Sequence, residues 1–271
     1  MIQYNFPTVI LYGSNAIQDL AKVVMEKKLK RLLLITDPGL IETGLANKVL
    51  HTFKNAGMDL EIYDGVHPNP IEDDVTAGVT AFISGQFEAL VALGGGSAMD
   101  VAKTIRFMAV HKPPLSQYDD AIGGDKKIIH PLPPMYAIPT TAGTGSEVGR
   151  SSVITIKETG RKTIFFHPRL IPDIAVLDPT LTIELPPLIT AATGMDAFTS
   201  AFESYWSTDS HPMSEKLNLE VIRLFKNNLV ISCTTGDKTA RSNCSYAATI
   251  SGVAYSNVRP NICHALGVPL S

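Results

Sequence analysis

Two glycine-rich segments carry the residue types that suit a phosphate-containing ligand. The first, Gly94-Gly95-Gly96-Ser97, follows the apolar run 89–93 and precedes a stretch with helical spacing. Glycines let the backbone approach a ligand closely, and the free N–H groups of a helix N-terminus attract an anion. Ser97 and Asp100 could instead form an ordinary capping box, but a cap requires no run of three glycines. We therefore favour phosphate binding at this turn.

This turn matches none of the common nucleotide or hydrolase fingerprints. Met99 stands where the Rossmann pattern needs glycine or alanine, and also where a nucleophile elbow needs glycine. No Gly-Lys-Ser/Thr follows, so the segment is not a P-loop. The sequence offers no Ser-His-Asp arrangement either, and we assign no catalytic side chain.

The second segment, Pro139 to Val148, places Thr140, Thr141, Thr144 and Ser146 among glycines. Hydroxyls and backbone amides without a cationic side chain suit ribose, pyrophosphate or a carboxamide, although such a segment can also be a plain polar loop. Both segments follow strands of one predicted sheet, and ligands bind such sheets beyond the carboxyl ends of the strands. The two turns therefore indicate one nucleotide site.

Asp37 ends the first strand that the sequence predicts, at 31–37. An acidic group there can accept hydrogen bonds from ribose hydroxyls and repel a 2′-phosphate, which favours NAD over NADP. The alternative is that Asp37 only begins the turn at Pro38-Gly39.

Alternating apolar runs and amphipathic stretches predict the elements that position these residues. Apolar strands without polar alternation, separated by helices, predict a parallel sheet covered on both faces. Strands are expected at 31–37, 60–63, 89–93, 135–139 and 175–179, helices at 41–56, 71–84 and 98–110, and an antiparallel strand at 151–156. The later part predicts helices at 188–206, 211–230 and 237–256, and another from about 260. We expect an α/β dinucleotide-binding domain at 1–184 and an all-helical domain at 185–271.

Composition excludes several classes of protein. The 271 residues are 45% hydrophobic and only 18% charged, with a net charge of −3, which argues against disorder and against a nucleic-acid or polybasic membrane surface. No apolar stretch is long enough to span a membrane, and the start has no signal-peptide pattern. Three cysteines without a CxxC motif favour reduced thiols and a cytoplasmic location.

The motifs together resemble one family. The first turn with its continuation Asp100-x-Ala102-Lys103, the threonine-rich segment, and Gly194-Met195-Asp196-Ala197 are similar, in order, to the iron-containing (group III) alcohol dehydrogenases. The resemblance runs from about residue 5 to the last residue. It implies an N-terminal α/β domain that binds NAD(P) and a helical domain that holds a divalent metal, Fe²⁺ or Zn²⁺, in the cleft between them.

The resemblance also assigns the cofactor residues. Gly95, Gly96, Ser97 and Asp100 take the pyrophosphate side, the hydroxyls of the second segment line the nucleotide, and Lys162 matches a lysine near the nicotinamide ribose. Small alcohols or aldehydes are the implied substrates, and a homodimer is the implied assembly.

The metal site departs from the family pattern of one Asp and three His. Asp196 matches the Asp, and His264 matches one His. The position one helical turn after Asp196 is Ser200, a hydroxyl that replaces imidazole poorly at Fe²⁺ or Zn²⁺. Val268 stands where the family often has another active-site His, and the fourth ligand would lie beyond Ser271, so we expect a C-terminally shortened member. His211 is the only other histidine nearby, and we expect it in a loop rather than as a replacement ligand.

Three functions remain open on the sequence. The first is NAD(P)-dependent, metal-assisted hydride transfer between nicotinamide and an alcohol or carbonyl. The second is a catalytically impaired nucleotide-binding relative, and the third is carbonyl reduction without metal. A shortened helical domain would expose apolar faces, in keeping with the mean hydropathy of +0.12, and would favour self-association.

Overall fold

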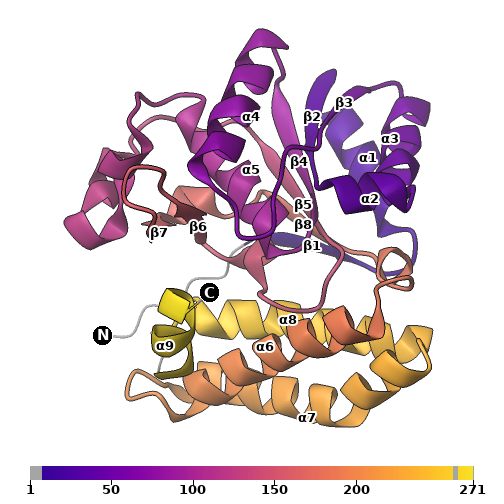
Figure 1. Ribbon diagram of the computed structural model, residues 1–271. Helices are drawn as coiled ribbons and strands as arrows, with labels where there is room; N and C mark the ends of the chain where they lie inside the picture. Colours follow the sequence, from indigo (N-terminus) through magenta and orange to yellow (C-terminus); the bar gives the residue numbers. More distant parts are fainter. Residues whose placement is uncertain (1–7, 259–261, 271) are drawn as a thin grey trace.

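The computed structural model describes residues 8–258 and 262–270, and in that part of the chain the main sheet has six parallel strands (Figure 1). Their order is β1-β8-β5-β4-β2-β3. The strands are β1 (Val9–Tyr12), β2 (Arg31–Ile35), β3 (Asp59–Tyr63), β4 (Ala89–Gly94), β5 (Met135–Pro139) and β8 (Ile174–Leu177). The predicted parallel sheet is confirmed, whereas β1 was not predicted.

Helices cover both faces of this sheet (Figure 1). One face carries α1 (Ala16–Glu26), α2 (Pro38–Glu42) and α3 (Leu45–Asn55), and the other carries α4 (Glu72–Ser84) and α5 (Gly96–Met108). Side chains along β2 alternate between the two cores: Leu34 packs on the first face and Leu33 on the second. Two buried faces explain why these strands are apolar without alternation.

The predicted helix at 41–56 is wrong at its N-terminal end, because two helices meet there. Gly44 separates α2 from α3 with a φ of +76°, a left-handed conformation that glycine adopts without steric cost. The predicted stop at Gly57 is confirmed, since its φ of +81° follows the end of α3.

A separate antiparallel pair flanks the main sheet. It joins β6 (Ser151–Thr155) to β7 (Lys162–Phe166), with Ser151 opposite Phe166. The antiparallel character of 151–156 was predicted, and its partner β7 was not. Short 3₁₀ helices connect the remaining elements: η1 (Leu115–Tyr118), η2 (Asp120–Ile122), η3 (Gly124–Lys127), η4 (Ser146–Val148), η5 (Pro168–Leu170) and η6 (Pro179–Leu181).

The later part of the chain is helical, as predicted, and lies below the α/β part in Figure 1. It contains α6 (Pro187–Trp206), α7 (Pro212–Thr234), α8 (Lys238–Tyr255) and α9 (Ile262–Leu270). Its core is rich in alanine, with Ala197, Ala201 and Ala247 fully buried, so the helices approach closely. The α/β elements end with η6 and the helices begin with α6, on either side of residue 184. A domain boundary at that point stays a prediction.

Two further sequence expectations concern membranes and thiols. Within the described residues, no helix is long and apolar enough to cross a membrane. Cys233, Cys244 and Cys263 are all free thiols, in keeping with the reduced state expected from their number and spacing.

Candidate active site

Asp37 and the first glycine-rich turn lie close together at the point where the strand order reverses. The chain passes from β2 outward to β3, returns to β4 beside β2, and continues in the other direction to β5, which opens a crevice at the carboxyl ends of β2 and β4. Asp37 follows β2, and its Oδ1 accepts a hydrogen bond from the Leu40 N–H (3.2 Å), capping α2. Its other oxygen, Oδ2, lies 3.6 Å from where a Cβ on Gly94 would stand. Asp37 therefore both begins a turn and faces the glycine turn.

The N-terminus of α5 is open to a ligand. Its N-cap is Gly95, and among the described residues no side chain caps it. Ser97 lies inside the first turn of the helix, so the alternative of a capping box with Asp100 is wrong. The first N–H groups of a helix have no partner within the helix, and here a phosphate can take them.

The two glycine-rich turns pack directly on each other. A Cβ on Gly95 would lie 3.3 Å from Thr141 Oγ1, and one on Gly96 would lie 3.0 Å from Thr144 Cγ2. An added Cβ at either position would require the neighbouring threonine side chain to shift. The sequence prediction that the two turns lie together is confirmed, although their contact with a nucleotide stays a prediction.

The threonine-rich segment also docks on the helical part of the chain. Gly145 has a φ of +64°, and a Cβ there would lie 2.6 Å from Gly252 Cα in α8. Ala142 is buried in the core of the helical part. This segment therefore contacts both the helical part and the turn after β4.

Buried charges lie beneath the threonine-rich segment. Lys103 in α5 is fully buried, and its Nζ donates to Ser146 Oγ (2.8 Å) and to the Ser151 carbonyl (2.9 Å). Asp100 accepts hydrogen bonds from Ser146 Oγ (3.1 Å) and from the Val153 N–H (3.1 Å). These bonds fix the segment to α5 and β6.

Burial shifts the pKa values of this cluster. Desolvation lowers the pKa of Lys103 to about 8, against the attraction of Asp100 and Glu147. Desolvation raises the pKa of Asp100 to about 6, with Lys103 opposing the shift. Glu147, which accepts a hydrogen bond from Thr249 Oγ1 (2.5 Å), also has a pKa raised by burial. The Asp100 carboxylate is therefore occupied by protein donors, and its predicted contact with a pyrophosphate stays a prediction.

The two predicted metal ligands come together with the substituted position. Asp196 and Ser200 lie one turn apart on α6, and Ser200 Oγ donates to the Asp196 carbonyl (3.0 Å). His264 in α9 brings its Nε2 to 3.8 Å from Asp196 Oδ1 and 3.4 Å from Ser200 Oγ. Burial raises the pKa of the Asp196 carboxyl, and the nearby His264 opposes that shift. The three positions 196, 200 and 264, which the sequence compared with metal ligands, therefore lie next to one another in the structure.

Glu203 joins this cluster and was missed from the sequence. Its Oε2 bonds to His264 Nδ1, and its Oε1 accepts the Cys263 N–H. Burial opposes the charged form, but the hydrogen bonds from His264 and Cys263 outweigh it and lower the pKa of Glu203. A signal existed: residues 196, 200 and 203 have the i, i+4, i+7 spacing of one helix face.

The donor atoms fit two ligands of a divalent metal. The 3.8 Å between Asp196 Oδ1 and His264 Nε2 lets both reach one ion at ordinary bond lengths of about 2.0–2.2 Å. A carboxylate behind the other ring nitrogen is the usual partner of a metal-binding histidine. Within the described part of the chain, no group of three or more His, Cys, Asp or Glu side chains forms a complete site. The side chain of Val268 and the whole of Ser271 lie outside the residues that the structure describes.

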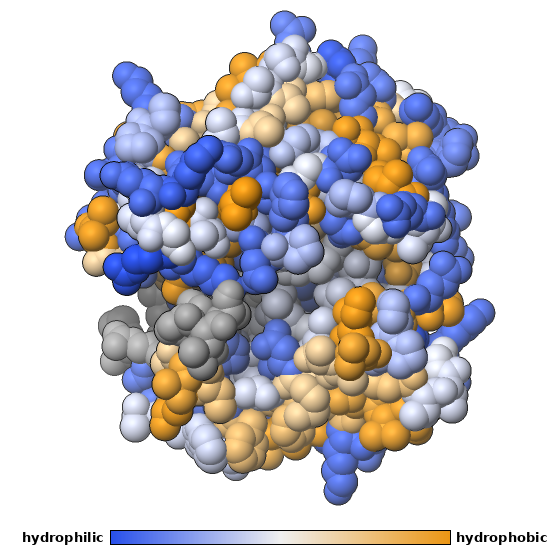
Figure 2. Space-filling model, in the orientation of Figure 1, coloured by the Kyte–Doolittle hydropathy of each residue, from blue (hydrophilic) through white to orange (hydrophobic). Residues whose placement is uncertain are grey.

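A cleft of about 1200 Å³ joins the nucleotide turn to the metal-ligand cluster. Figure 2 shows the surface hollowed between the α/β part and the helices. The predicted residues that line it are Gly96, Asp100, Thr144, Ser146, Asp196 and His264, together with Ser200. Its volume exceeds the roughly 300–1,000 Å³ of a typical ligand pocket, which leaves room for a dinucleotide and a small substrate.

Other predicted residues lie outside this lining. Asp37, Gly95, Ser97, Thr140 and Thr141 are not among the described side chains around the cleft. Lys162 begins β7 and donates to Asn69 Oδ1 (2.9 Å). His211 lies in the connection between α6 and α7, as expected, where it is buried and caps α7, its Nδ1 accepting the Ser214 N–H (3.2 Å). These contacts give His211 the role of a helix cap and do not favour it as a replacement metal ligand.

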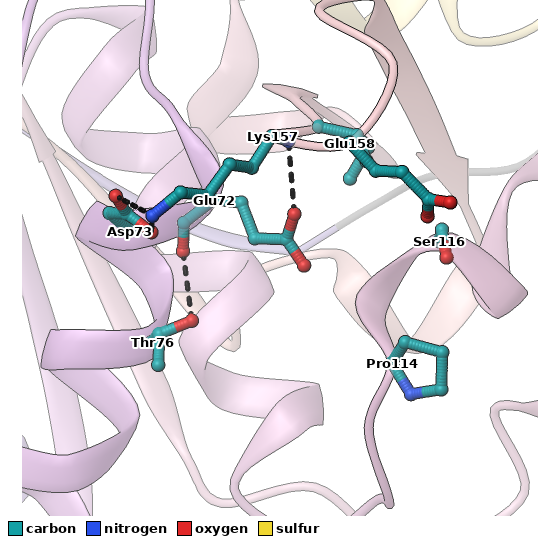
Figure 3. A pocket seen from close by; sticks show the side chains of 8 residues that line it. Glu72, Asp73, Thr76, Pro114, Ser116, Lys157 and Glu158 are labelled. Atoms are coloured by element: carbon teal, nitrogen blue, oxygen red, sulfur yellow. Dashed lines mark hydrogen bonds and ion pairs between the residues drawn. The ribbon is translucent and has the colours of Figure 1, made fainter.

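A second hollow, of about 450 Å³, holds no predicted site residue (Figure 3). Lys157 spans it, pairing with Asp73 (2.8 Å) while its backbone N–H donates to Glu72 Oε2 (3.0 Å). These exposed pairs attach α4 to the end of β6. The chemistry therefore belongs to the larger cleft.

A dinucleotide-type sheet crevice that opens onto a carboxylate and an imidazole is the arrangement expected of a nicotinamide-dependent, metal-assisted oxidoreductase. Residues 7–179 match the family described as iron-containing alcohol dehydrogenase, and residues 190–271 match the C-terminal part of the same family. The chain belongs to the iron-containing alcohol dehydrogenase family, whose members are enzymes.

Individual relatives agree with this assignment. The chain is 39% identical over 269 residues to 1,3-propanediol dehydrogenase of Klebsiella pneumoniae, covering 98% of this chain and 68% of the relative. The structure of an alcohol dehydrogenase from Oenococcus oeni matches with a TM-score of 0.95 at 31% identity, covering all of this chain and 70% of that one. A sulfoacetaldehyde reductase from Bifidobacterium kashiwanohense, solved with NAD⁺, matches at 28% identity with a TM-score of 0.90, covering all of this chain and 69% of that one. The family resemblance and the α/β-plus-helical fold predicted from the sequence are thereby confirmed.

Proposed function

We propose that this protein is an NAD-dependent alcohol dehydrogenase or aldehyde reductase acting on small alcohols and carbonyls. One observation carries the proposal: a single cleft joins the N-terminus of α5 to Asp196 and His264. The nucleotide end and the metal-ligand end of the cleft belong to different parts of the chain, so their meeting is a property of the folded protein.

Each end of the cleft has a distinct task. The first turn of α5 and the hydroxyls of the threonine-rich segment hold the pyrophosphate and ribose. Asp37 accepts ribose hydroxyls and disfavours a 2′-phosphate, so NAD is preferred over NADP. Asp196 and His264 would hold Fe²⁺ or Zn²⁺ beside the substrate oxygen. When bound, the metal supplies Lewis acidity and the nicotinamide carries the hydride.

A second candidate is a nucleotide-binding relative with impaired catalysis. Ser200 favours it, because a neutral hydroxyl stands one turn from Asp196 and donates to a backbone carbonyl. A weakly held metal would leave the nucleotide site intact and the reaction slow.

Oxidation of NADH with short aldehydes separates these functions. The assay is run on metal-free protein, with added Fe²⁺ under anaerobic conditions, with Zn²⁺, and with a chelator, while calorimetry measures NAD affinity. Turnover that requires metal supports the first candidate, and NAD binding without turnover under any condition supports the second. Chelator-resistant turnover would instead indicate metal-free carbonyl reduction. Absence of NAD binding would overturn both candidates.

We also propose that the protein is a cytoplasmic homodimer. The exposed apolar side chains on α6 support self-association: Leu188 is 81% exposed and Trp206 57% exposed. Figure 2 shows apolar residues gathered over the helical part. Free thiols suit a reducing compartment. Light scattering after size-exclusion chromatography tests the assembly, and a stable monomer would contradict it.

A further inference from the structure

Glu203 is a buried carboxylate whose two oxygens both bind the segment that carries His264. Glu203 is 0% exposed, although it lies in α6 only two turns from the half-exposed Asp196. A buried ionised carboxylate is costly unless hydrogen bonds compensate it. Here the compensation comes from His264 Nδ1 and the Cys263 N–H, both in the first turn of α9.

The contact with Nδ1 decides which nitrogen of His264 faces the cleft. An ionised carboxylate can only accept, so Nδ1 must carry the hydrogen and a neutral ring must leave Nε2 with its lone pair. Nε2 is the atom that lies 3.8 Å from Asp196 Oδ1. The ring of Tyr255 packs on His264 with centroids 5.1 Å apart, which restricts rotation of the imidazole.

We propose that Glu203 is a positioning residue: it fixes the tautomer and orientation of His264 so that Nε2 is presented beside Asp196 for a divalent metal. Only the identity of the group that Nε2 would bind, a divalent metal, rests on the proposed function. The second contact, to the Cys263 N–H, anchors the first turn of α9 at the same time. Glu203 thereby compensates for part of what Ser200 does not supply, by preorganising the imidazole that remains.

The test compares Glu203→Gln and Glu203→Ala with the wild type in two measurements. Gln keeps the shape but offers one acceptor oxygen and one donor amide, so it cannot accept from both Nδ1–H and the Cys263 N–H. Glu220→Gln is the matched control, because Glu220 is an α7 carboxylate paired with Arg223 at the surface. Circular dichroism and thermal unfolding establish that each variant is folded.

The first measurement is independent of metal and of activity. Long-range ¹H–¹⁵N spectra of the metal-free protein at alkaline pH report the His264 tautomer, with His264→Asn identifying the signal. We expect the Nδ1–H form in the wild type and in Glu220→Gln, and a shift toward a mixture or the Nε2–H form in both Glu203 variants. An unchanged tautomer in folded Glu203→Gln and Glu203→Ala would overturn the proposal.

The second measurement is the affinity for Zn²⁺ alone, by calorimetry against a competing chelator. Loss of such a partner costs about 10–100-fold in metal affinity, and we expect that loss in the Glu203 variants and not in Glu220→Gln. If wild-type protein bound no Zn²⁺, the metal part of the proposed function would fail while the tautomer still decided the role of Glu203. Equal Zn²⁺ affinity in wild type and Glu203→Gln would contradict the positioning role.

Discussion

Restoring an imidazole at the substituted ligand position is the sharpest test of the metal site. In Ser200→His, the new side chain would project from α6 one turn after Asp196, on the same face. Ser200 Oγ already lies 3.4 Å from His264 Nε2, and Ser200 lines the large cleft. A longer side chain therefore has room toward the cleft, and its ring reaches the region between Asp196 and His264.

The expected gain is large because a neutral hydroxyl is exchanged for a strong ligand. Loss of a group that only supports a ligand costs about 10–100-fold in metal affinity, or about 1.4–2.8 kcal/mol. A direct ligand contributes at least as much. We therefore expect Ser200→His to bind Zn²⁺ at least about 10–100-fold more tightly than the wild type, with NAD affinity unchanged, since the N-terminus of α5 is not altered.

The assay is calorimetric titration of metal-free protein with Zn²⁺, in the presence of a competing chelator. Ser200→Ala removes the hydroxyl without adding a ligand and should match the wild type closely. Met195→His adds an imidazole to the same helix at a position that is 50% exposed and does not line the cleft, so it controls for nonspecific binding. Equal Zn²⁺ affinity in the wild type, Met195→His and folded Ser200→His would refute the assignment of residues 196, 200 and 264 to one metal site.

Further predictions concern the nucleotide side. Gly145→Ala should weaken NAD binding and destabilise the protein by more than Gly160→Ala, because both have positive φ but only Gly145 has backbone within 3 Å of the added Cβ; calorimetry and urea unfolding compare them. Lys103→Met should lower the free energy of unfolding by about 3–5 kcal/mol, since it leaves buried carboxylates without their cation, and an unchanged urea midpoint would contradict this. Because the pKa of Asp100 is raised in the folded protein, its protonated form stabilises the fold below the unfolded pKa, and this contribution is lost as pH rises through about 6. Asp100→Asn should therefore flatten the fall in the free energy of unfolding between about pH 4 and 6. Asp37→Ser should raise NADP affinity relative to NAD, and an unchanged ratio would remove Asp37 from cofactor selection.

Local sequence patterns determined much of the α/β part. Uninterrupted apolar runs located β2, β4 and β5 because both faces of this sheet are buried. Glycine runs marked the places where α5 and the threonine-rich segment approach each other so closely that an added Cβ would contact Thr141 or Thr144. The break between α2 and α3 escaped prediction, since an isolated glycine inside a helical pattern is equally compatible with a continuous helix.

The sequence by itself determined the order of most of the elements, the positions of the glycine turns, and the spacing that places Asp196 and Ser200 on one helix face. Only the tertiary structure decided that Gly95, and not Ser97, is the N-cap of α5, and that Glu203 contacts His264. Glu203 and His264 are 61 residues apart, and Glu147 and Thr249 are 102 apart. The first pair depends on how α6 packs against α9, and the second on how α8 packs against η4. Helical periodicity specifies which face is buried without specifying what that face will meet.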